Sequence, residues 1–241
     1  MLVPFTVDPD VLREKNPGLD DMRRHATLLN MWGLLGQLVI PANTESESEL
    51  VAALKEAPQN VRTIWREAIK NYRKRPGNPS FERALREDIP VTDESVCSGL
   101  RLVVLEPTRG ELWGLPVDAY STLVAGNVEI CRFGHQDATG VVQNAMALSN
   151  RPITRNEKPD QVWRERLQDL AAATGVVTIV DRYALKNFLE PSAAISGLER
   201  LMRNLAGLHV PNKKIVNLYS AYSIDWGLTG SSRNFDSACK Q

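Results

Sequence analysis

The chain has 241 residues, of which 43% are hydrophobic and 24% are charged. These values are typical of globular proteins, so we expect either one large α/β domain or a smaller domain with a substantial appendage. Lys and Arg balance Asp and Glu at 29 each, which excludes a global field that attracts nucleic acid or an anionic membrane. Any such binding must come from a local patch.

The cysteines and the N-terminus bear on the cellular compartment. Cys97, Cys131 and Cys239 are an odd number without CxxC spacing, which argues against a disulfide framework and against a zinc site. The N-terminus lacks the basic and apolar regions of a signal peptide, and the apolar stretches are too short or too interrupted to span a bilayer. We therefore expect a cytoplasmic protein with reduced thiols and no membrane partner.

The first part of the chain is predicted to be mainly helical. A short strand is expected at residues 2–7, where Pro4 favours an edge or strand-start position, and another at residues 38–40. Helices are predicted from about Asp20 to Gly33 or Gly36, after a capping box formed by Ser46 and Glu49, over residues 59–72 and over residues 80–87.

The polar segment 88–98 marks a soft boundary, after which strands appear. We therefore divide the chain into residues 1–90, a mainly helical N-terminal part, and residues 91–241, an α/β part with a mixed sheet. Strands are predicted at 100–105, 112–115 and 123–133, the last with a turn at Gly126-Asn127 that favours antiparallel pairing. Residues 108–110 are predicted to form a turn, and helices are predicted at 140–149 and 159–174.

Residues 176–220 carry the clearest strand-helix-strand pattern. The β-branched run at 176–180 is typical of a strand buried on both faces. Ser196 and Glu199 form a capping box for a helix that Gly207 ends, and a second strand follows. A crossover of this length favours a parallel pair. We predict an α/β fold: a helical N-terminal part packed on a mixed, partly parallel sheet with crossover helices, whose parallel portion includes 176–181 and 214–220.

Acidic residues follow several of the predicted strands. Asp8, Glu106 and Asp181 each come after an apolar run, and Asp225 comes shortly after another. If the strands are parallel neighbours, these carboxylates converge at one sheet edge, where Asp181 and Asp8 would hold Mg²⁺ or Mn²⁺ for phosphodiester cleavage. The alternative is structural, because Asp is common at strand ends and in turns.

One helix carries the best local basic patch. Arg62, Arg66, Lys70 and Arg73 lie about one turn apart on the polar side of the helix predicted at 59–72. This basic stripe, together with Arg182 beside Asp181, is a candidate nucleic-acid-binding surface. The alternative for the stripe is a solvated helix face.

Several kinds of site lack their signatures. His25, His135 and His209 have no second His or Cys at metal-ligand spacing, so they do not predict a metal site. The sequence has no GxSxG, no Walker loop and no GxGxxG after a strand. We therefore expect no zinc, no nucleotide cofactor and no serine hydrolase.

The sequence VTIVDRYALKNFLE, followed by SGLERLMRNLAGL and KKIVNLYSAYS, resembles one half of the phospholipase-D-like fold, over about residues 162–223. In that fold a strand ends in an Asp-Arg-Tyr or Asp-Pro-Tyr step and leads into a helix and a second strand. The active family uses an HxK motif, which this chain lacks. The resemblance therefore implies a member that lost this chemistry or one that resembles the inactive members that bind partners or membranes, and it transfers no catalytic residue.

Two functional hypotheses follow. The first is a metal-dependent, nuclease-like phosphodiesterase with Asp8, Glu106 and Asp181 as catalytic residues and the basic stripe as nucleic-acid contact. The second is a non-catalytic adaptor or subunit that binds a protein partner or a second copy, because the sheet ends early. A role in prokaryotic genome defence accommodates either hypothesis by analogy.

Overall fold

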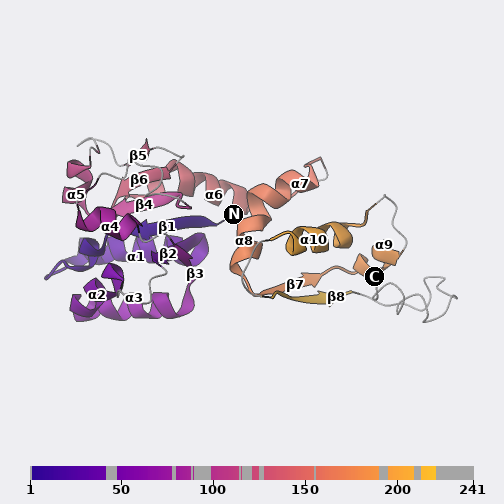
Figure 1. Cartoon of the computed structure of the whole chain (residues 1–241), viewed down its shortest axis with the longest axis horizontal. Helices are drawn as coiled ribbons and strands as arrows, with labels where there is room; N and C mark the ends of the chain where they lie inside the picture. Colours follow the sequence, from indigo (N-terminus) through magenta and orange to yellow (C-terminus); the bar gives the residue numbers. More distant parts are fainter. Residues whose placement is uncertain are drawn as a thin grey trace. The chain divides into compact units, whose positions relative to one another are not determined.

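In the computed structural model the chain forms two compact units, Met1–Ala173 and Thr174–Gln241, whose helices and strands are labelled in Figure 1. The described residues are 2–41, 48–77, 80–87, 89, 99–113, 115, 121–124, 128–154, 156–189, 195–208 and 213–220. The units do not divide near residue 90, because strands from both sides of that position pair in one sheet. Each unit is described by itself below.

The first unit contains a six-stranded sheet, with the order β3-β2-β1-β4-β6-β5. Five of these strands are parallel and β5 runs antiparallel to β6, which confirms the predicted α/β class with a mixed sheet. The strands are β1 Val3–Val7, β2 Gly36–Pro41, β3 Lys74–Gly77, β4 Leu102–Leu105, β5 Ser121–Val124 and β6 Val128–Arg132.

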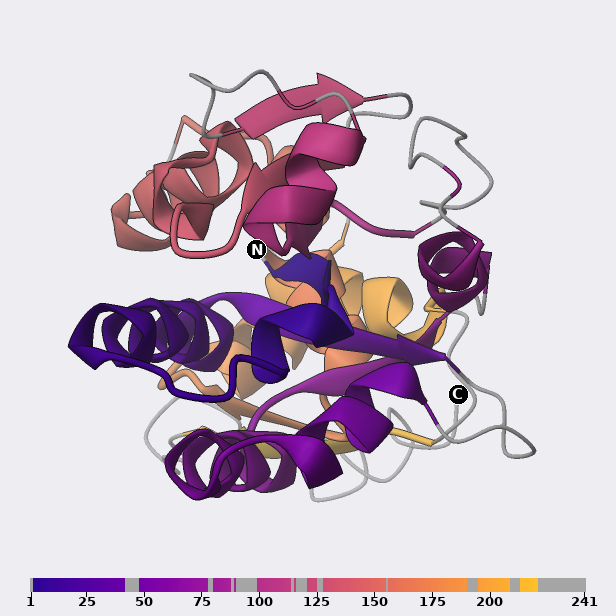
Figure 2. The ribbon, with the colours of Figure 1, turned by 90° about the vertical axis from the view of Figure 1, so that its left-hand side faces the viewer.

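Helices cover both faces of this sheet. The helices of this unit are α1 Leu19–Leu34, α2 Glu49–Glu56, α3 Gln59–Asn71, α4 Ser80–Arg86, α5 Pro107–Leu112, α6 Gly140–Asn150, α7 Pro159–Val162 and α8 Gln168–Ala173, with 3-10 turns at Pro9–Leu12 (η1) and Gln136–Ala138 (η3) and a π-helical turn at Trp163–Leu167 (η4). Buried residues of α1, α2, α3 and α6 share one core cluster, and those of α4 belong to another. Figure 2 shows α1 and α6 on the left of the strands and α4 on the right.

Strand β1 lies in the centre of the sheet, so of the two positions expected for Pro4, an edge or a strand start, the strand start is confirmed. The pairing with β4 begins at Phe5, opposite Leu102. Pro4, which has no N–H to donate, therefore precedes the first paired residue on that side, and its carbonyl accepts from the N–H of Arg101 at 2.8 Å. A proline is tolerated here because it interrupts no ladder hydrogen bond.

Residues 74–77, for which no strand was predicted, form strand β3, which pairs with β2 although its sequence is KRPG. One further prediction was wrong. Residues 107–112 form helix α5, where a turn at 108–110 and a strand from 112 were expected. Pro107 occupies the first turn of α5, and the carboxylate of Glu106 accepts from the N–H groups of Thr108 and Arg109.

The expected capping residue Ser46 lies outside the described residues, and the N-cap residue of α2 is Ser48.

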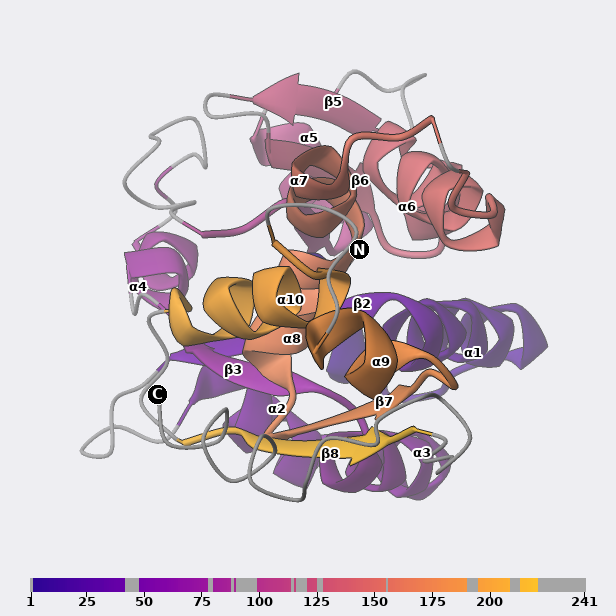
Figure 3. The same cartoon turned by 90° about the vertical axis from the view of Figure 1, so that its right-hand side faces the viewer.

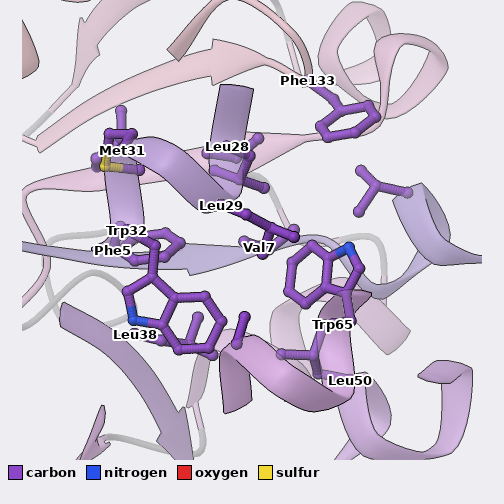
Figure 4. Close-up of a cluster of buried hydrophobic side chains, with 14 of the residues drawn as sticks. Phe5, Val7, Leu28, Leu29, Met31, Trp32, Leu38, Leu50, Trp65 and Phe133 are labelled. Atoms are coloured by element: carbon purple, nitrogen blue, oxygen red, sulfur yellow. The ribbon is translucent and has the colours of Figure 1, made fainter. Parts of the chain in front are cut away.

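The larger core cluster is aromatic at its centre. Phe5, Trp32 and Trp65 are fully buried there, and Figure 4 shows them between β1 and the helices. His25 is buried beside them at 1% exposure, and its Nδ1 accepts from the indole Nε1 of Trp65 at 3.1 Å. Burial lowers the pKa of His25 to about 4, because the charged form cannot be solvated there.

The second unit is a strand pair with helices on one side. Its elements are β7 Val176–Val180, α9 Ala184–Leu189, α10 Gly197–Ala206 and β8 Ile215–Tyr219. The two strands are parallel, as predicted, but they form a separate two-stranded sheet and not the parallel portion of the mixed sheet, so that part of the prediction was wrong. The oxygen of Ser196 accepts from the N–H of Glu199. Helix α10 lies over one face of the strand pair (Figures 1 and 3). The prediction of a strand buried on both faces was wrong, because alternate residues of β7 and β8 are exposed.

The buried His25 makes stability depend on pH. The pKa of His25 is lower in the folded chain than the ordinary value near 6.5, so the unfolded chain takes up a proton first as the pH falls. Stability is fully present above about pH 6.5 and is lost toward pH 4, by about 2 kcal/mol at pH 5. Urea unfolding at pH 7.5 and 5.0 measures this loss. His25→Gln serves as the control, since it stays uncharged and should lack this part of the pH dependence; an equal dependence in both chains would contradict the assignment.

Candidate functional site

The candidate site lies at the carboxyl ends of β1 and β4. Strands β2 and β3 extend the sheet on one side of β1, while β4 and β6 extend it on the other. The chain order therefore reverses between β1 and β4, and such switch points open a crevice in which doubly wound sheets bind ligands. Asp8 follows β1 and Glu106 follows β4, so the structure places these two predicted residues at this switch point.

The carboxylate of Asp8 is fully buried and accepts three hydrogen bonds. Its Oδ1 accepts from the N–H of Asp10 at 3.0 Å, which caps the turn η1. Its Oδ2 accepts from the N–H of Glu106 at 3.3 Å and from Nε of Arg109 at 2.8 Å. Asp8 thus joins the ends of both strands and the first turn of α5.

Arg109 bridges two carboxylates. Its Nε binds Asp8 and its Nη2 donates to Oδ2 of Asp10 at 2.7 Å. The side chain of Arg109 is 17% exposed and that of Asp10 is 33% exposed, so solvent reaches this part of the site. The guanidinium also lies 5.9 Å from the ring centroid of Trp113, which is buried. We call Asp8, Asp10 and Arg109 the switch-point triad.

Glu106 contributes its backbone to this site, whereas its carboxylate faces its own helix. Both oxygens of the side chain are engaged by Thr108, and Oε2 also accepts from the N–H of Arg109 at 3.1 Å. The predicted convergence of Asp8 and Glu106 therefore holds for the strand ends, while the second carboxylate beside Asp8 belongs to Asp10.

Burial and charge oppose each other in the triad. Burial raises the pKa of Asp8, although the N–H of Asp10 and the charge of Arg109 act in the other direction. Partial burial acts to raise the pKa of Asp10, but the hydrogen bonds from Arg109 and Arg13 outweigh this effect. The pKa of Asp10 therefore lies below its ordinary value. Burial lowers the pKa of Arg109, but its bonds to both carboxylates outweigh burial and raise it. Two carboxylates of different character thus share one cation.

Asp181 and Arg182 lie in the second unit, at the carboxyl end of β7. The Oδ1 of Asp181 accepts from the N–H of Tyr183 at 2.8 Å, which forms a local turn. The guanidinium of Arg182 lies 5.8 Å from the ring centroid of Tyr183. All three residues are exposed. Asp225, the remaining strand-end acid, lies outside the described residues.

The basic stripe is only partly available for phosphate. Arg62 donates through Nε and Nη2 to the carbonyl of Ala57, and Nη1 of Arg73 donates to the carbonyl of Gly33 at 3.3 Å. Arg66 and Lys70 are exposed on α3. Fewer residues of the basic stripe therefore project freely into solvent than their spacing in the sequence predicted.

Asp10 and Arg109 were missed in the sequence. Asp10 follows Asp8 by two residues, and this spacing after a buried strand was a usable signal. Glu106-Pro107 was a second signal, because an acid before proline is typical of a helix N-terminus, which places Arg109 in the first turn. The pairing of Arg109 with Asp8, 101 residues away, had no local signal.

The described residues contain neither a metal-holding cluster nor a membrane-spanning helix. No group of three or more His, Cys, Asp or Glu side chains within the described ranges is arranged to hold a metal ion. In the same part of the chain, every helix is too short or too polar to cross a membrane.

Comparisons with known proteins add no identification. No family model matches the chain, and neither a curated protein nor a solved structure was found to match it. The class that can be stated is therefore a doubly wound α/β protein with an acid-arginine cluster at its switch point.

The triad predicts a strong asymmetry between single and double substitutions. Arg109→Met leaves the buried carboxylate of Asp8 without its cation, and breaking such a pair costs about 3 kcal/mol or more of unfolding free energy. The double variant Asp8→Asn with Arg109→Met removes both charges and should recover part of this loss. Urea unfolding of the four chains in the cycle measures the coupling. The deficit of Arg109→Met should shrink as the pH falls, because protonation neutralises Asp8; a pH-independent deficit would contradict this account.

Proposed function

We propose that the chain is a metal-dependent phosphodiesterase whose site is the switch-point triad. The observation that supports this proposal is the bridging of a fully buried carboxylate and a partly exposed carboxylate by one guanidinium, at the crevice of a doubly wound sheet. Clustered groups with shifted pKa values in a crevice are more frequent at functional sites than elsewhere.

The donor set suits a hard divalent cation. Carboxylate oxygens are the ligands that Mg²⁺ and Mn²⁺ prefer, and Mg²⁺ is commonly held by one or two carboxylates together with substrate phosphates. Asp8 and Asp10 would supply the two carboxylates. The bound cation would polarise the phosphoryl oxygen and stabilise the charge that develops on it.

Arg109 has a second role in this proposal. Its guanidinium donates to both carboxylates and balances part of their negative charge. With a divalent cation held by Asp8 and Asp10, Arg109 would be available for the phosphate of the substrate, for which its planar donor group is suited. Arg109 and the divalent cation would thus compete for Asp8 while both could contact the substrate.

Cleavage of single- and double-stranded DNA and RNA tests the proposal. We expect cleavage with Mg²⁺ or Mn²⁺, none with EDTA, and loss of detectable cleavage in Asp8→Asn and in Asp10→Asn. Both substitutions preserve side-chain shape, and a thermal unfolding curve for each variant separates lost chemistry from lost folding. Undiminished cleavage in both variants would rule out the triad as the site.

Asp181→Asn is the matched comparison, because it removes the same charge from the end of a different strand. Cleavage that is lost in Asp181→Asn alone would assign the reaction to the end of β7. Loss in all three variants would mean that acids of both units take part.

We further propose that the exposed part of the basic stripe contacts nucleic acid. Replacing Arg66 and Lys70 with Gln should weaken binding in a gel-shift assay and reduce the slope of log affinity against log salt by about 2, since each phosphate contact contributes about 0.9. The control replaces Arg23 and Arg83 with Gln, because both are exposed and paired with acids. Equal effects in the two double variants would show that net charge alone matters.

A second candidate function is a non-catalytic adaptor or subunit, and the exposed sheet face of the second unit supports it. The resemblance of this region to the phospholipase-D-like half without HxK agrees with a binding role. Absence of cleavage by the wild-type chain under all metal conditions, together with a retained binding partner, would favour this candidate. A role in prokaryotic genome defence is compatible with both candidates.

A further inference from the structure

The second unit has a core on one side of its sheet only. Among its described residues, only Ala184, Ser196 and Leu205 are buried. The half-buried residues of β7 and β8 alternate with exposed ones, and α10 lies over one face (Figure 3). The other face of the strand pair carries none of the helices described in this unit.

The uncovered face is apolar and uncharged. The parallel register sets Val176 beside Ile215 and Val180 beside Tyr219. These four side chains are 50%, 60%, 79% and 62% exposed, respectively. Thr178 and Asn217 lie between them and are also exposed. We call these six residues the open face.

A parallel strand pair of this kind is not expected to remain uncovered. Parallel sheets occur almost only with both faces covered, and an isolated pair of strands is marginally stable in water. Scattered apolar residues on a surface are ordinary, but the open face is contiguous and belongs to a unit with little core of its own. The open face therefore has the character of an interface.

We propose that the open face is covered by the open face of a second copy of this chain. An interface with two-fold symmetry requires a patch that complements itself, and a patch without charge opposes a copy of itself without repulsion. Two such sheets packed face to face form two layers with helices outside, so that each parallel pair gains its missing cover. This inference deepens the adaptor function by naming the partner, and it is independent of the phosphodiesterase function.

The size of the open face sets the strength of the contact. Its six residues expose on the order of 500 Å² per copy, so a dimer would bury about 1,000 Å² in total, at the lower limit for a specific interface. The dimer should therefore be reversible and should form at micromolar concentrations.

The net charge of the second unit gives the dimer a distinctive salt dependence. The second unit contains eight Lys and Arg against five Asp and Glu, a net charge of +3. Two copies repel each other through these charges, and salt screens the repulsion. Association through the open face should therefore become tighter with salt, in contrast to binding of nucleic acid, which salt weakens.

Sedimentation velocity of the full chain between about 1 and 200 μM, at 50 and 300 mM NaCl, tests the proposal. We expect a monomer-dimer equilibrium that is tighter at the higher salt concentration. Val180→Lys and Tyr219→Lys should each weaken it at least tenfold, because each would bury a charge in an apolar contact. Met202→Lys is the matched control, since Met202 is exposed on α10, and it should change the dissociation constant by less than twofold.

Three outcomes would overturn the inference. The first is a wild-type chain that stays monomeric over the whole range. The second is a dimer that both Val180→Lys and Tyr219→Lys leave intact, since another surface would then hold it. The third is a monomeric chain that binds a different protein in a manner sensitive to Val180→Lys; the adaptor function would then stand without self-association. Circular dichroism of each variant checks that it is folded.

Discussion

The buried carboxylate of Asp8 is the constraint around which the first unit closes. It lies at the end of the central strand, and its oxygens are bound by the turn that follows β1, by the chain leaving β4 and by helix α5. A carboxylate without these donors could not remain charged at zero exposure, because desolvation would raise its pKa until it took up a proton. The positions of β4 and α5 relative to β1 are therefore fixed partly by the need to satisfy one buried charge.

In the proposed function, stability and chemistry would depend on the same atoms. Arg109 pairs with both Asp8 and Asp10, and a divalent cation at the same carboxylates would have to displace it. The affinity for that cation would therefore be reduced by the free energy of the ion pairs that are broken. Under this proposal a weak metal site would be completed by substrate phosphate, because the phosphate would give the displaced guanidinium a new partner. Asp181 offers a contrast, because it ends a strand in the same way but is exposed and is bound by the N–H of Tyr183 two residues later.

The sequence was informative for several elements that are determined locally. The strand at 2–7, the helix from about Asp20 and the helix capped by Ser196 and Glu199 were each predicted and are present. It was less informative where a distant partner decides the outcome. Residues 74–77 have little strand propensity and are extended because β2 pairs with them, and no local feature links Arg109 to its partner Asp8. In the candidate site, the positions of Asp8 and of the backbone of Glu106 at the strand ends were predictable from the sequence. The pairing of Arg109 with Asp8 and Asp10 was not.

Strands β7 and β8 show a different limit of prediction from sequence, which concerns burial. A run such as VVTIV specifies a strand, but its burial depends on what packs against each face, and the sequence of the strand does not contain that information. The first unit supplies helices to both faces of its own sheet, so its core is complete within one chain. Few of the described residues of the second unit are buried, so a partner that covers the open face would raise the free energy of unfolding of this unit. If a second copy covers it, the stability of this unit rises with chain concentration by mass action while that of the first unit does not. The unfolding transitions of the two units would then shift relative to each other as the chain concentration changes, although no residue of either has changed.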